Sequence, residues 1–167
     1  MLLEYDEFAS PIGRILFASD GEATCALDFA GYEKRMESLL LRRFGAFEFR
    51  RGSDSQNLKA RLRRYFDGDL HALESAPAST GGSAFQQQVW KALRTIPSGE
   101  TWTYGELAAR LGCPRAARAV GHANSLNPVA IIVPCHRVIG ASAKLTGYAG
   151  GLERKQWLLR HEGALLV

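Results

Sequence analysis

A run of apolar, mostly β-branched residues with a proline at each end constrains this chain more than any other stretch. The run is Pro128-Val129-Ala130-Ile131-Ile132-Val133-Pro134. Val and Ile suit a pleated surface, so the run predicts a buried strand. Pro134 ends that strand, because proline has no N–H to donate to a ladder. Cys135 follows at once, so we expect a cysteine at a strand exit, where scaffolds often present reactive groups.

The residues after Cys135 favour a reactive thiol. A cysteine in a folded protein is most often a small buried core residue. Here His136 and Arg137 come directly after it, and cationic neighbours favour the thiolate, which is the reactive form. A thiolate beside a histidine is shared by proteases, thiol transferases and redox proteins. We therefore expect nucleophilic chemistry at Cys135, with its type left open by these residues alone.

The cysteines indicate a reducing compartment. The chain of 167 residues has three of them, Cys25, Cys113 and Cys135, at wide and unpatterned spacing. An odd number without a pattern argues against a disulfide framework, and no pair has zinc-finger spacing. The N-terminus lacks a signal-peptide pattern, and no apolar run is long enough to span a bilayer. We expect a cytoplasmic protein without a membrane segment, a metal or a cofactor.

The positive charge is concentrated in the half of the chain that holds Cys135. The net charge is +4, from 21 basic and 17 acidic residues. Residues 1–82 carry 11 basic and 13 acidic residues, whereas residues 83–167 carry 10 basic and 4 acidic ones. A solvated charged face would explain this imbalance, and so would a polyanionic partner, most simply nucleic acid.

The chain divides into two parts of different character. Short apolar runs separated by turn residues predict a small sheet before residue 30. Helical spacing of apolar residues predicts helices over 31–44 and 54–66, the second capped by Asp54 and with Arg61, Arg63 and Arg64 left for solvent. We expect an α+β fold, with a small N-terminal β-sheet with helices and then a mostly helical C-terminal domain with a helix-turn-helix. The predicted boundaries are 1–76 for the N-terminal domain, 77–82 for a linker and 83–167 for the catalytic and DNA-binding domain.

The C-terminal part contains the signals of a helix-turn-helix. Capping boxes begin at Ser83 and at Thr103. Gly112 is a stop signal for the helix that starts after Thr103, and a third helix is expected over 115–124. Two short helices joined by a Gly-containing turn are typical of a DNA-binding pair, although many such pairs bind nothing.

The surface of that third helix is dominated by small residues. Base-edge readout in the major groove needs several long hydrogen-bonding side chains, and this helix has few. Small residues instead allow close approach to a backbone or a narrow groove, as expected of a helix that binds DNA without regard to sequence. The small residues are Ala116, Ala117, Ala119, Gly121 and Ala123.

The residues beyond Cys135 predict a loop and a final helix. The loop is expected over 139–144, followed by a Gly-rich segment over 145–151 and a helix over 152–162 that Gly163 ends. The stretch Ala149-Gly150-Gly151 could offer free backbone N–H groups to a ligand oxygen. A tight turn would explain the same composition, and both interpretations stay open.

Several motifs together resemble one family, the bacterial constitutive type of O6-alkylguanine-DNA alkyltransferases, or methylated-DNA–protein-cysteine methyltransferases. The resemblance covers nearly all of 83–163 and is looser over the N-terminal part. Its most specific motif is Ile132-Val133-Pro134-Cys135-His136-Arg137-Val138, the active-site signature. The other motifs, in order, are Phe85-Gln86-Gln87-Gln88-Val89-Trp90, Tyr104, Ala116-Ala117-Arg118-Ala119-Val120-Gly121, Asn127-Pro128, Thr146-Gly147-Tyr148-Ala149-Gly150-Gly151 and Leu158-Leu159-Arg160-His161-Glu162-Gly163.

The resemblance implies repair of DNA by direct reversal. The alkyl group of O6-alkylguanine, and of O4-alkylthymine, in duplex DNA would pass irreversibly to Cys135 in a single turnover, after the damaged base has flipped out. His136 would activate Cys135 through a water, Glu162 would orient His136, and Asn127 would be the hinge that bonds backbone between the recognition helix and the cysteine segment. Tyr104 would promote flipping and donate to guanine N3. We expect a monomer, with cooperativity along DNA left open.

The resemblance also implies the residues that touch DNA and line the pocket. Arg118 matches the arginine finger that fills the gap left by the flipped base, and the Ala149 N–H would reach O6, where some relatives have a serine. The implied DNA-binding residues are Tyr104, Arg115, Ala117, Arg118 and Gly121, and the implied pocket residues are Pro134, Val138, Tyr148, Ala149 and Gly150.

Other functions remain as alternatives. A DNA-binding lesion sensor without transferase activity would resemble this chain, but such relatives lack the nucleophilic cysteine. A transcription regulator would need more base-reading side chains, and a cysteine hydrolase would not need a helix-turn-helix. Relatives that bind structural zinc use N-terminal Cys and His residues, and Cys25 with His71 are too few, so no metal is expected. Cys113 is expected to be structural.

Overall fold

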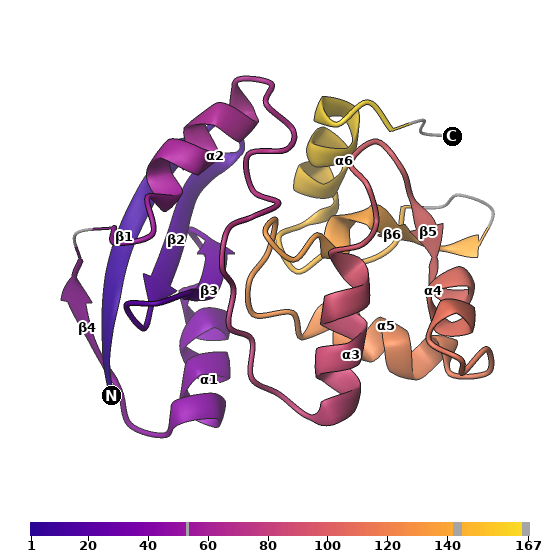
Figure 1. Ribbon diagram of the computed structural model, residues 1–167, viewed down its shortest axis with the longest axis horizontal. Coiled ribbons are helices and arrows are strands. Elements are labelled where there is room, and N and C mark those ends of the chain that lie inside the picture. Colours follow the sequence, from indigo (N-terminus) through magenta and orange to yellow (C-terminus); the bar gives the residue numbers. More distant parts are fainter. Residues whose placement is uncertain (53, 142–144, 165–167) are drawn as a thin grey trace. The chain divides into compact units, whose positions relative to one another are not determined.

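The computed structural model describes residues 1–52, 54–141 and 145–164 (Figure 1). Contacts divide the chain into two compact units: Met1–Gly81 with Pro128–Ile132, and Gly82–Asn127 with Val133–Val167. We expected all of 83–167 to form one domain, whereas Pro128–Ile132 belongs to the first unit by its contacts. Among the described residues, no helix is both long enough and apolar enough to cross a bilayer.

The first unit is built on a four-stranded sheet with the strand order β3-β2-β1-β4. The first three strands are antiparallel neighbours, and β4 pairs parallel to β1. The turn at Gly13 and the Asp20–Gly21 turn join the antiparallel strands, as the turn residues predicted. The strands are β1 (Leu2–Ser10), β2 (Gly13–Ser19), β3 (Thr24–Phe29) and β4 (Glu48–Arg51), and the helices are α1 (Glu33–Phe44) and α2 (Leu58–Phe66).

One apolar cluster holds α1 against this sheet. Met36 and Leu40 lie one turn apart on α1, so both point to the same side of the helix. They pack with Leu3 and Leu16 of the sheet in a cluster that is almost fully buried. Burial of each large apolar side chain contributes about 1.5–3 kcal/mol, so this cluster stabilises the packing of α1 on the sheet. Cys25 lies in the same cluster, and burial raises the pKa of its thiol to about 11.

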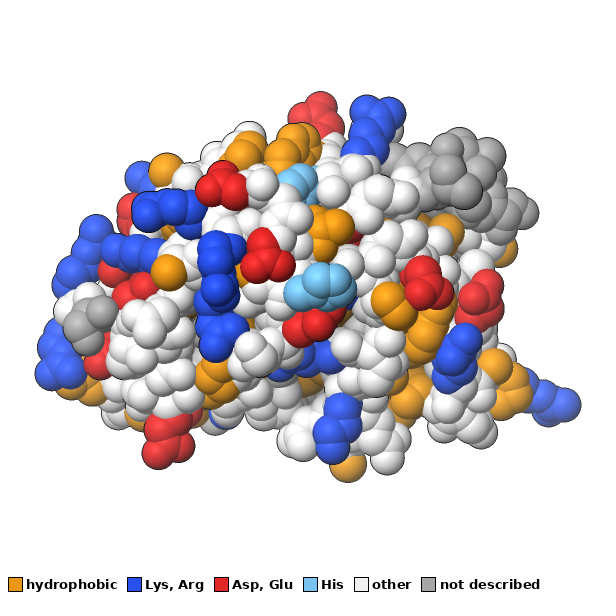
Figure 2. All heavy atoms as spheres, turned by 45° about the horizontal axis from the view of Figure 1, so that its top comes forward, with side chains coloured by type: hydrophobic (Ala, Val, Ile, Leu, Met, Phe, Trp, Pro, Cys, Tyr) orange, Lys and Arg blue, Asp and Glu red, His pale blue; other side chains and the backbone are white. Residues whose placement is uncertain are grey.

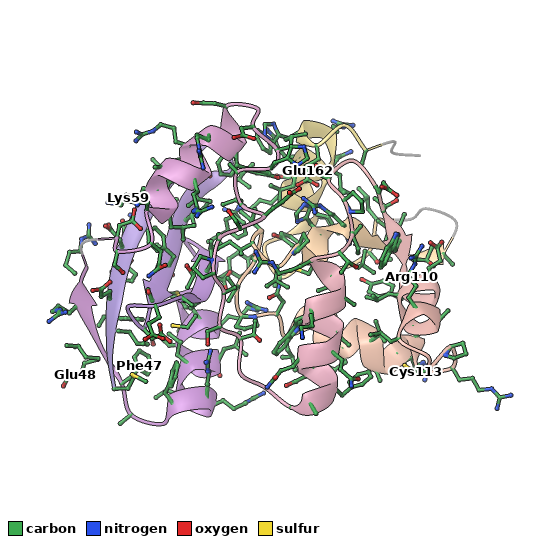
Figure 3. All side chains as sticks on the ribbon, viewed as in Figure 1. Phe47, Glu48, Lys59, Arg110, Cys113 and Glu162 are labelled. Atoms are coloured by element: carbon green, nitrogen blue, oxygen red, sulfur yellow. The ribbon has the colours of Figure 1, made fainter. Side chains whose placement is uncertain are left out.

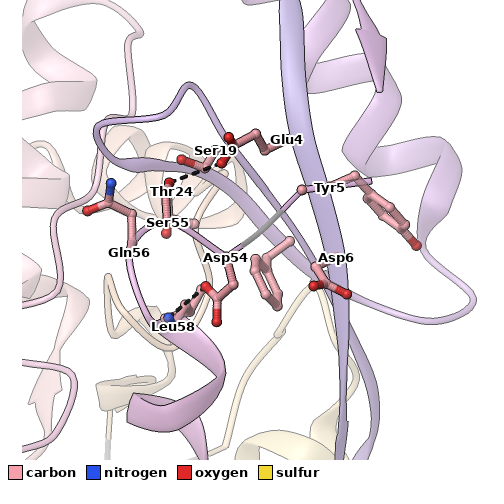
Figure 4. Close-up of a pocket in the computed structure, with 11 residues that line it drawn as sticks. Glu4, Tyr5, Asp6, Ser19, Thr24, Asp54, Ser55, Gln56 and Leu58 are labelled. Carbon is pink, nitrogen blue, oxygen red and sulfur yellow. Dashed lines mark hydrogen bonds between the residues drawn. The ribbon is translucent and has the colours of Figure 1, made fainter. Parts of the chain in front are cut away.

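The second helix of this unit begins later than the sequence predicts. The helix was expected from Asp54, but α2 starts at Leu58. Asp54 still caps it, because its carboxylate accepts from the backbone N–H of Leu58 at 2.8 Å (Figure 4) and from that of Lys59 at 2.9 Å. The hollow lined by Asp54 and its neighbours has a volume of only about 10 Å³. The carboxylate therefore serves the helix rather than a ligand site.

The arginines of α2 do not all face solvent. Figure 2 shows Lys and Arg side chains gathered over part of one face of the molecule. Arg63 and Arg64 are exposed, as expected. Arg61 is only partly exposed, because its guanidinium donates to Ala72 O at 3.2 Å and Ser75 Oγ at 2.8 Å. The prediction for Arg61 is therefore wrong.

The predicted linker is anchored at its start. Thr24 N donates to Pro77 O at 3.0 Å, and Ser79 N donates back to Thr24 O at 2.9 Å. Arg43 of α1 also donates to the carbonyl and the hydroxyl of Ser79. A segment rich in Gly, Ser and Pro has much conformational freedom when it makes no contacts. These bonds to β3 and α1 restrict that freedom. The expected boundaries of 1–76, 77–82 and 83–167 stay a prediction.

The second unit is mostly helical. Ser83 opens its first helix with the predicted capping box: Gln86 N donates to Ser83 Oγ at 3.1 Å, and Ser83 N donates to Gln86 Oε1 at 3.0 Å. Two short strands, β5 and β6, pair in parallel. The elements are α3 (Ala84–Leu93), β5 (Trp102–Thr103), α4 (Tyr104–Arg110), α5 (Ala117–Ser125), the 3₁₀ helix η1 (Cys135–Arg137), β6 (Val138–Ile139) and α6 (Leu152–His161).

The helices α4 and α5 form the predicted helix-turn-helix. Thr103 caps α4 by accepting from Glu106 N at 3.0 Å. Gly112, at φ +78°, ends α4 in the left-handed conformation that glycine adopts without strain. Its N–H bonds to Ala109 O and the N–H of Cys113 bonds to Ala108 O, each at 3.0 Å, which is the Schellman pattern. The sequence therefore predicted both ends of α4, although only the Thr103 half of the expected capping box is present in the described residues.

The structure does not contain the buried strand predicted over 128–133. Instead of a continuous strand, this run contains isolated bridge residues, of which Val129 pairs with Leu27 of β3. Ile131 has φ +69°, and Ile132 N donates to Ala130 O at 2.8 Å, so the chain makes a tight turn where the strand should continue. Positive φ is unusual for a β-branched residue, so the composition gave no sign of this turn.

Two predictions beyond Cys135 change in detail. The loop expected over 139–144 begins later, because Ile139 belongs to β6. Its residues 142–144 lie outside the described residues. The last helix, expected over 152–162, is α6 and ends at His161, with Glu162 as its C-cap.

Candidate active site

Cys135 sits at the start of η1, where a tight turn directs it. Pro134 has φ −81° and ψ 65°, and Cys135 N donates to Val133 O at 2.8 Å. These values describe an inverse γ-turn, a common way to end an extended segment. Cys135 is 5% exposed, so its thiol is buried but borders a cavity described below.

Glu162 is the hub of a buried polar cluster behind Cys135. Its Oε2 lies 3.0 Å from His136 Nε2. Arg137 makes a bidentate interaction with the same carboxylate, through Nε at 2.9 Å and Nη2 at 3.0 Å. Arg137 Nη1 donates to Ile96 O at 2.6 Å. His136 is fully buried and Glu162 is 4% exposed, so these bonds act in a low-dielectric environment where they are strong.

The charge state of Glu162 follows from these contacts. Burial alone would raise its pKa, but the charge and hydrogen bonds of His136 and Arg137 outweigh burial and hold the pKa well below its usual range. A carboxylate only accepts, so His136 Nε2 must carry the hydrogen of that bond. In neutral imidazole the lone pair then lies on Nδ1. That atom is buried and has no hydrogen-bond partner among the described residues.

The thiol borders a cavity of about 350 Å³ within the second unit. The helix-turn-helix supplies one wall, the η1 segment another, and the Gly-rich segment a third. The ring of Tyr104 lies against Gly121, where an added Cβ would meet Tyr104 Cδ1 at 3.7 Å. The lining residues are Tyr104, Gly121, Asn124, Ser125, Cys135, Gly147, Tyr148 and Ala149.

The cavity brings together some of the predicted pocket residues. Tyr148 and Ala149 line it together with Cys135, whereas Pro134, Val138 and Gly150 are not among its lining residues. Sequence reasoning missed Asn124, Ser125 and Gly147, which also line it. Asn124 is one of the few polar residues of α5, and this is the signal that could have revealed it.

Two asparagines tie α5 to the cysteine segment. Asn127 is 1% exposed and its Nδ2 donates to Val133 O at 2.8 Å. Asn124 Nδ2 donates a longer bond of 3.4 Å to Cys135 O. The predicted position of Asn127 between the recognition helix and Cys135 therefore coincides with a real backbone contact.

A buried lysine that sequence reasoning missed holds the cavity wall. Lys155 is fully buried, and its Nζ donates to Val138 O at 2.6 Å and Thr146 O at 2.7 Å. Burial lowers the pKa of Lys155 to about 8, and attraction to the Cys135 thiolate opposes that shift. Lys155 lies three and four residues before the buried Leu158 and Leu159. This spacing on one helix face is the signal that could have revealed it.

The candidate DNA-binding residues lie on α5 and the turn before it. Arg115 and Arg118 are exposed, and Ala117 and Gly121 are partly exposed. The Arg118 side chain has no hydrogen bond or ion pair within the described ranges. Among the described residues, no side chain caps the start of α5. In Figure 3, Glu162 lies at the end of α6 and Cys113 in the turn between α4 and α5.

The chain is similar to known proteins over nearly its whole length. Residues 84–164 match the family described as 6-O-methylguanine DNA methyltransferase, DNA binding domain. The methylated-DNA–protein-cysteine methyltransferase of Shigella flexneri is 48% identical over 170 residues, which cover 99% of this chain and 98% of the relative. The relative of that name from Methanosarcina acetivorans is 48% identical over 163 residues, covering 96% and 98%. The crystal structure of Mycobacterium tuberculosis OGT in complex with DNA aligns with a TM-score of 0.79 and 43% identity, covering 98% of this chain and 93% of that chain.

The helix-turn-helix and the buried cysteine, histidine and glutamate define the class, a cysteine-dependent transferase built on a DNA-binding fold. The chain belongs to the methylated-DNA–protein-cysteine methyltransferase family. The family suggested by the sequence motifs and the α+β fold class are both confirmed.

Proposed function

We propose that this protein repairs DNA by direct reversal, moving the alkyl group of O6-alkylguanine in duplex DNA onto Cys135 Sγ. The observation that carries this proposal is the cavity of the helix-turn-helix unit, which Cys135 borders while His136 and Glu162 lie buried behind it. A cavity of about 350 Å³ lies in the range of small-molecule sites and suits one flipped base. The target atom is unreachable inside the base stack, so the base must leave the duplex first.

The first chemical step generates the thiolate. His136 Nδ1 holds its lone pair in a buried position without a partner among the described residues. A water between Nδ1 and Cys135 would relay the thiol proton to the imidazole. Glu162 stabilises the imidazolium that forms, because it keeps its negative charge and accepts from Nε2. This is the arrangement of an activated nucleophile, a base and an orienting acid.

The second step transfers the alkyl group. The thiolate sulfur attacks the alkyl carbon in line with the bond to O6, so an S–C bond forms as the C–O6 bond breaks. The electron pair of the broken bond goes to the leaving guanine. The thioether is stable, and no residue in this site is arranged to hydrolyse it, so each molecule reacts once. O4-alkylthymine presents the same alkyl–oxygen bond, and we include it as a substrate.

We assign to Tyr104 the role of neutralising the charge that develops on the leaving guanine. Thr146 Oγ1 donates to the Tyr104 hydroxyl at 3.2 Å, so the hydroxyl accepts there and keeps its own hydrogen to donate. We assign that hydrogen to guanine N3. Such a donor aimed at developing charge lowers the barrier of the transfer step. We also assign the Ala149 N–H to O6 and Tyr148 to the wall around the base, because both residues line the cavity. The pocket roles expected for Pro134, Val138 and Gly150 stay predictions.

We assign DNA binding to α5 and to the turn before it. Arg118 has a long cationic side chain on a helix rich in small residues, and it has no hydrogen bond or ion pair to any described residue. We assign to it the role of filling the gap left by the flipped base. Arg115 would contact phosphate, and Ala117 and Gly121 would allow close approach of the backbone. Asn127 would join α5 to the cysteine segment, through its bond to Val133 O.

The protein should act as a monomer in the cytoplasm. None of the described cysteines Cys25, Cys113 and Cys135 forms a disulfide, and a reducing compartment would keep Cys135 in the reactive state. Whether neighbouring molecules bind DNA cooperatively is a separate property that the transfer reaction does not require. A lesion sensor without transferase activity would not need Cys135, so the site does not favour that alternative.

Reaction stoichiometry tests the proposal. We expect excess duplex DNA with O6-methylguanine to lose one methyl group per protein molecule and then no more. The Cys135→Ser variant should bind the same DNA and transfer nothing. Continued turnover, or transfer by Cys135→Ser at the wild-type rate, would refute the mechanism.

A further inference from the structure

The outer edge of β4 is open. β4 lies at one end of the strand order of the four-stranded sheet (Figure 1), and its residues are all exposed. No described strand pairs with its outer side. An open edge presents backbone N–H and C=O groups to any strand that approaches, and proteins often protect such edges by making them short and charged. β4 is short and mostly charged, so the pattern of its charges decides what it pairs with.

The backbone of β4 directs alternate residues to this edge. Glu48 N donates to Met1 O at 2.9 Å, and Gly52 N donates to Tyr5 O at 3.0 Å. The even-numbered residues of the strand therefore turn their backbone groups toward β1. Because the direction of N–H and C=O alternates along a strand, Phe49 turns its backbone groups toward the open edge.

The side chains of β4 are self-complementary in one register. In a two-fold symmetric antiparallel pair, directly opposite residues share a face of the sheet, so the symmetry axis passes beside one residue. An axis beside Phe49 places Glu48 of each copy opposite Arg50 of the other. An axis beside Glu48 or beside Arg50 would set that residue opposite its own copy, and like charges directly opposite each other are destabilising. The charges of β4 therefore select the register centred on Phe49.

We propose that β4 binds β4 of a second copy of this chain in that register, which joins the two sheets into one. The two Phe49 residues, whose backbone groups face the edge, then exchange two N–H···O bonds. The two pairs of Glu48 with Arg50 lie on one face. On the other face Phe49, which is 38% exposed, packs against its copy. Its ring also lies 5.1 Å from those of Tyr5 and Phe47, so the second copy covers an aromatic cluster that is partly exposed in the monomer.

This pairing is separate from the transfer reaction. β4 has four residues, far fewer than the roughly 20–30 residues that each side contributes to a standard interface. The pair is therefore weak, and dilute protein is a monomer. Each copy carries its own Cys135 and its own helix-turn-helix, so the monomer remains the unit that transfers the alkyl group.

Two charge-reversed variants test the pairing by sedimentation equilibrium. The mass of wild type should rise from 18.3 kDa toward twice that value between about 10 μM and 1 mM. Glu48→Arg alone and Arg50→Glu alone should each raise the dimer dissociation constant at least about tenfold, because each sets like charges opposite each other. An equal mixture of the two variants should regain association, because each then meets the opposite charges on the other. Glu22→Arg, the same change in the exposed turn between β2 and β3, is the matched control and should associate like wild type.

Amide hydrogen exchange tests the edge itself. The N–H of Phe49 should exchange at least about threefold more slowly in concentrated than in dilute protein, whereas that of Gly52, already bonded to Tyr5 O, should not change. A wild-type mass that stays at 18.3 kDa, or a mixture that associates no better than its separate variants, would overturn the proposal. Dimers with an unchanged Phe49 N–H would place the contact elsewhere and also reject it. Each variant should still transfer methyl groups at the wild-type rate, which shows that it is folded.

Discussion

His136 Nε2 lies 3.0 Å from Glu162 Oε2, with the two residues 26 positions apart in the chain and both side chains fully buried. Because the carboxylate fixes the hydrogen on Nε2, the basic lone pair of the imidazole is directed to Nδ1. Arg137 holds the other side of the same carboxylate. The base in this site is therefore oriented by a glutamate that is itself held in place.

Replacement of Glu162 by glutamine should slow the transfer step. Glu162→Gln removes the charge that stabilises the His136 imidazolium, so we expect the single-turnover rate to fall at least about 100-fold. It also leaves Arg137 buried without a counter-charge, which should lower the free energy of unfolding by about 3 kcal/mol. Binding of duplex DNA should not change. Glu153→Gln makes the same chemical change at an exposed position of α6 and should affect neither quantity; an equal loss in both variants would argue against the role of Glu162.

The buried Lys155 should make stability depend on alkaline pH. Its pKa is lowered from 10.5 to about 8 by burial, so between these values the unfolded chain binds more protons than the folded one. Stability therefore rises with pH across this window. Relative to Lys155→Met, the free energy of unfolding of wild type should be constant below about pH 8 and gain on the order of 3 kcal/mol by about pH 10.5.

Urea unfolding at a series of pH values measures this difference. Lys91→Met, at an exposed position of α3, serves as the control and should show no such slope. A flat difference between wild type and Lys155→Met would mean that the buried amine does not titrate in this window.

Removal of the Arg118 side chain should affect duplex DNA more than a free base. We expect Arg118→Ala to slow repair of O6-methylguanine in duplex DNA about tenfold or more, since the side chain would no longer replace the flipped base. Reaction with free O6-benzylguanine should change by less than about twofold, because no flipping is needed. Arg63→Ala changes an exposed arginine of α2 and should leave both reactions intact. Equal losses on both substrates would remove the finger role.

Loss of the Tyr104 hydroxyl should slow chemistry without weakening binding. Tyr104→Phe keeps the ring against Gly121 but removes the donor aimed at guanine N3. We expect the transfer rate at saturating DNA to fall about tenfold or more, with the DNA dissociation constant unchanged. Thr146→Val removes only the bond that Thr146 makes to this hydroxyl and should have a smaller effect. A weaker binding constant with an unchanged transfer rate would contradict the assignment.

Local signals predicted the helices of the second unit well. The capping box at Ser83 and the stop at Gly112 depend on residues a few positions apart, so the sequence contains the whole cause. The predicted strand over 128–133 failed because its conformation depends on Leu27, about 100 residues away, and on a positive φ at Ile131. A β-branched run does not encode either feature.

The candidate site was predictable in part. Motif resemblance named Cys135, His136 and Glu162, and the hydrogen bond between the last two agrees with the roles expected. It did not reveal the buried charge of Lys155 or the open acceptor of Asn124, because the burial of a polar group depends on partners that only the folded chain brings together. Lys155 carries the prediction on alkaline pH, which the sequence alone could not have made.

The mass of one peptide tests the central claim most directly. The protein is incubated with one equivalent of duplex DNA containing O6-methylguanine, digested, and the peptide that contains Cys135 is weighed and fragmented. The account predicts a single added methyl group on Cys135, and none on Cys25 or Cys113. A methyl group on another residue, or repaired DNA with unmodified Cys135, would contradict it.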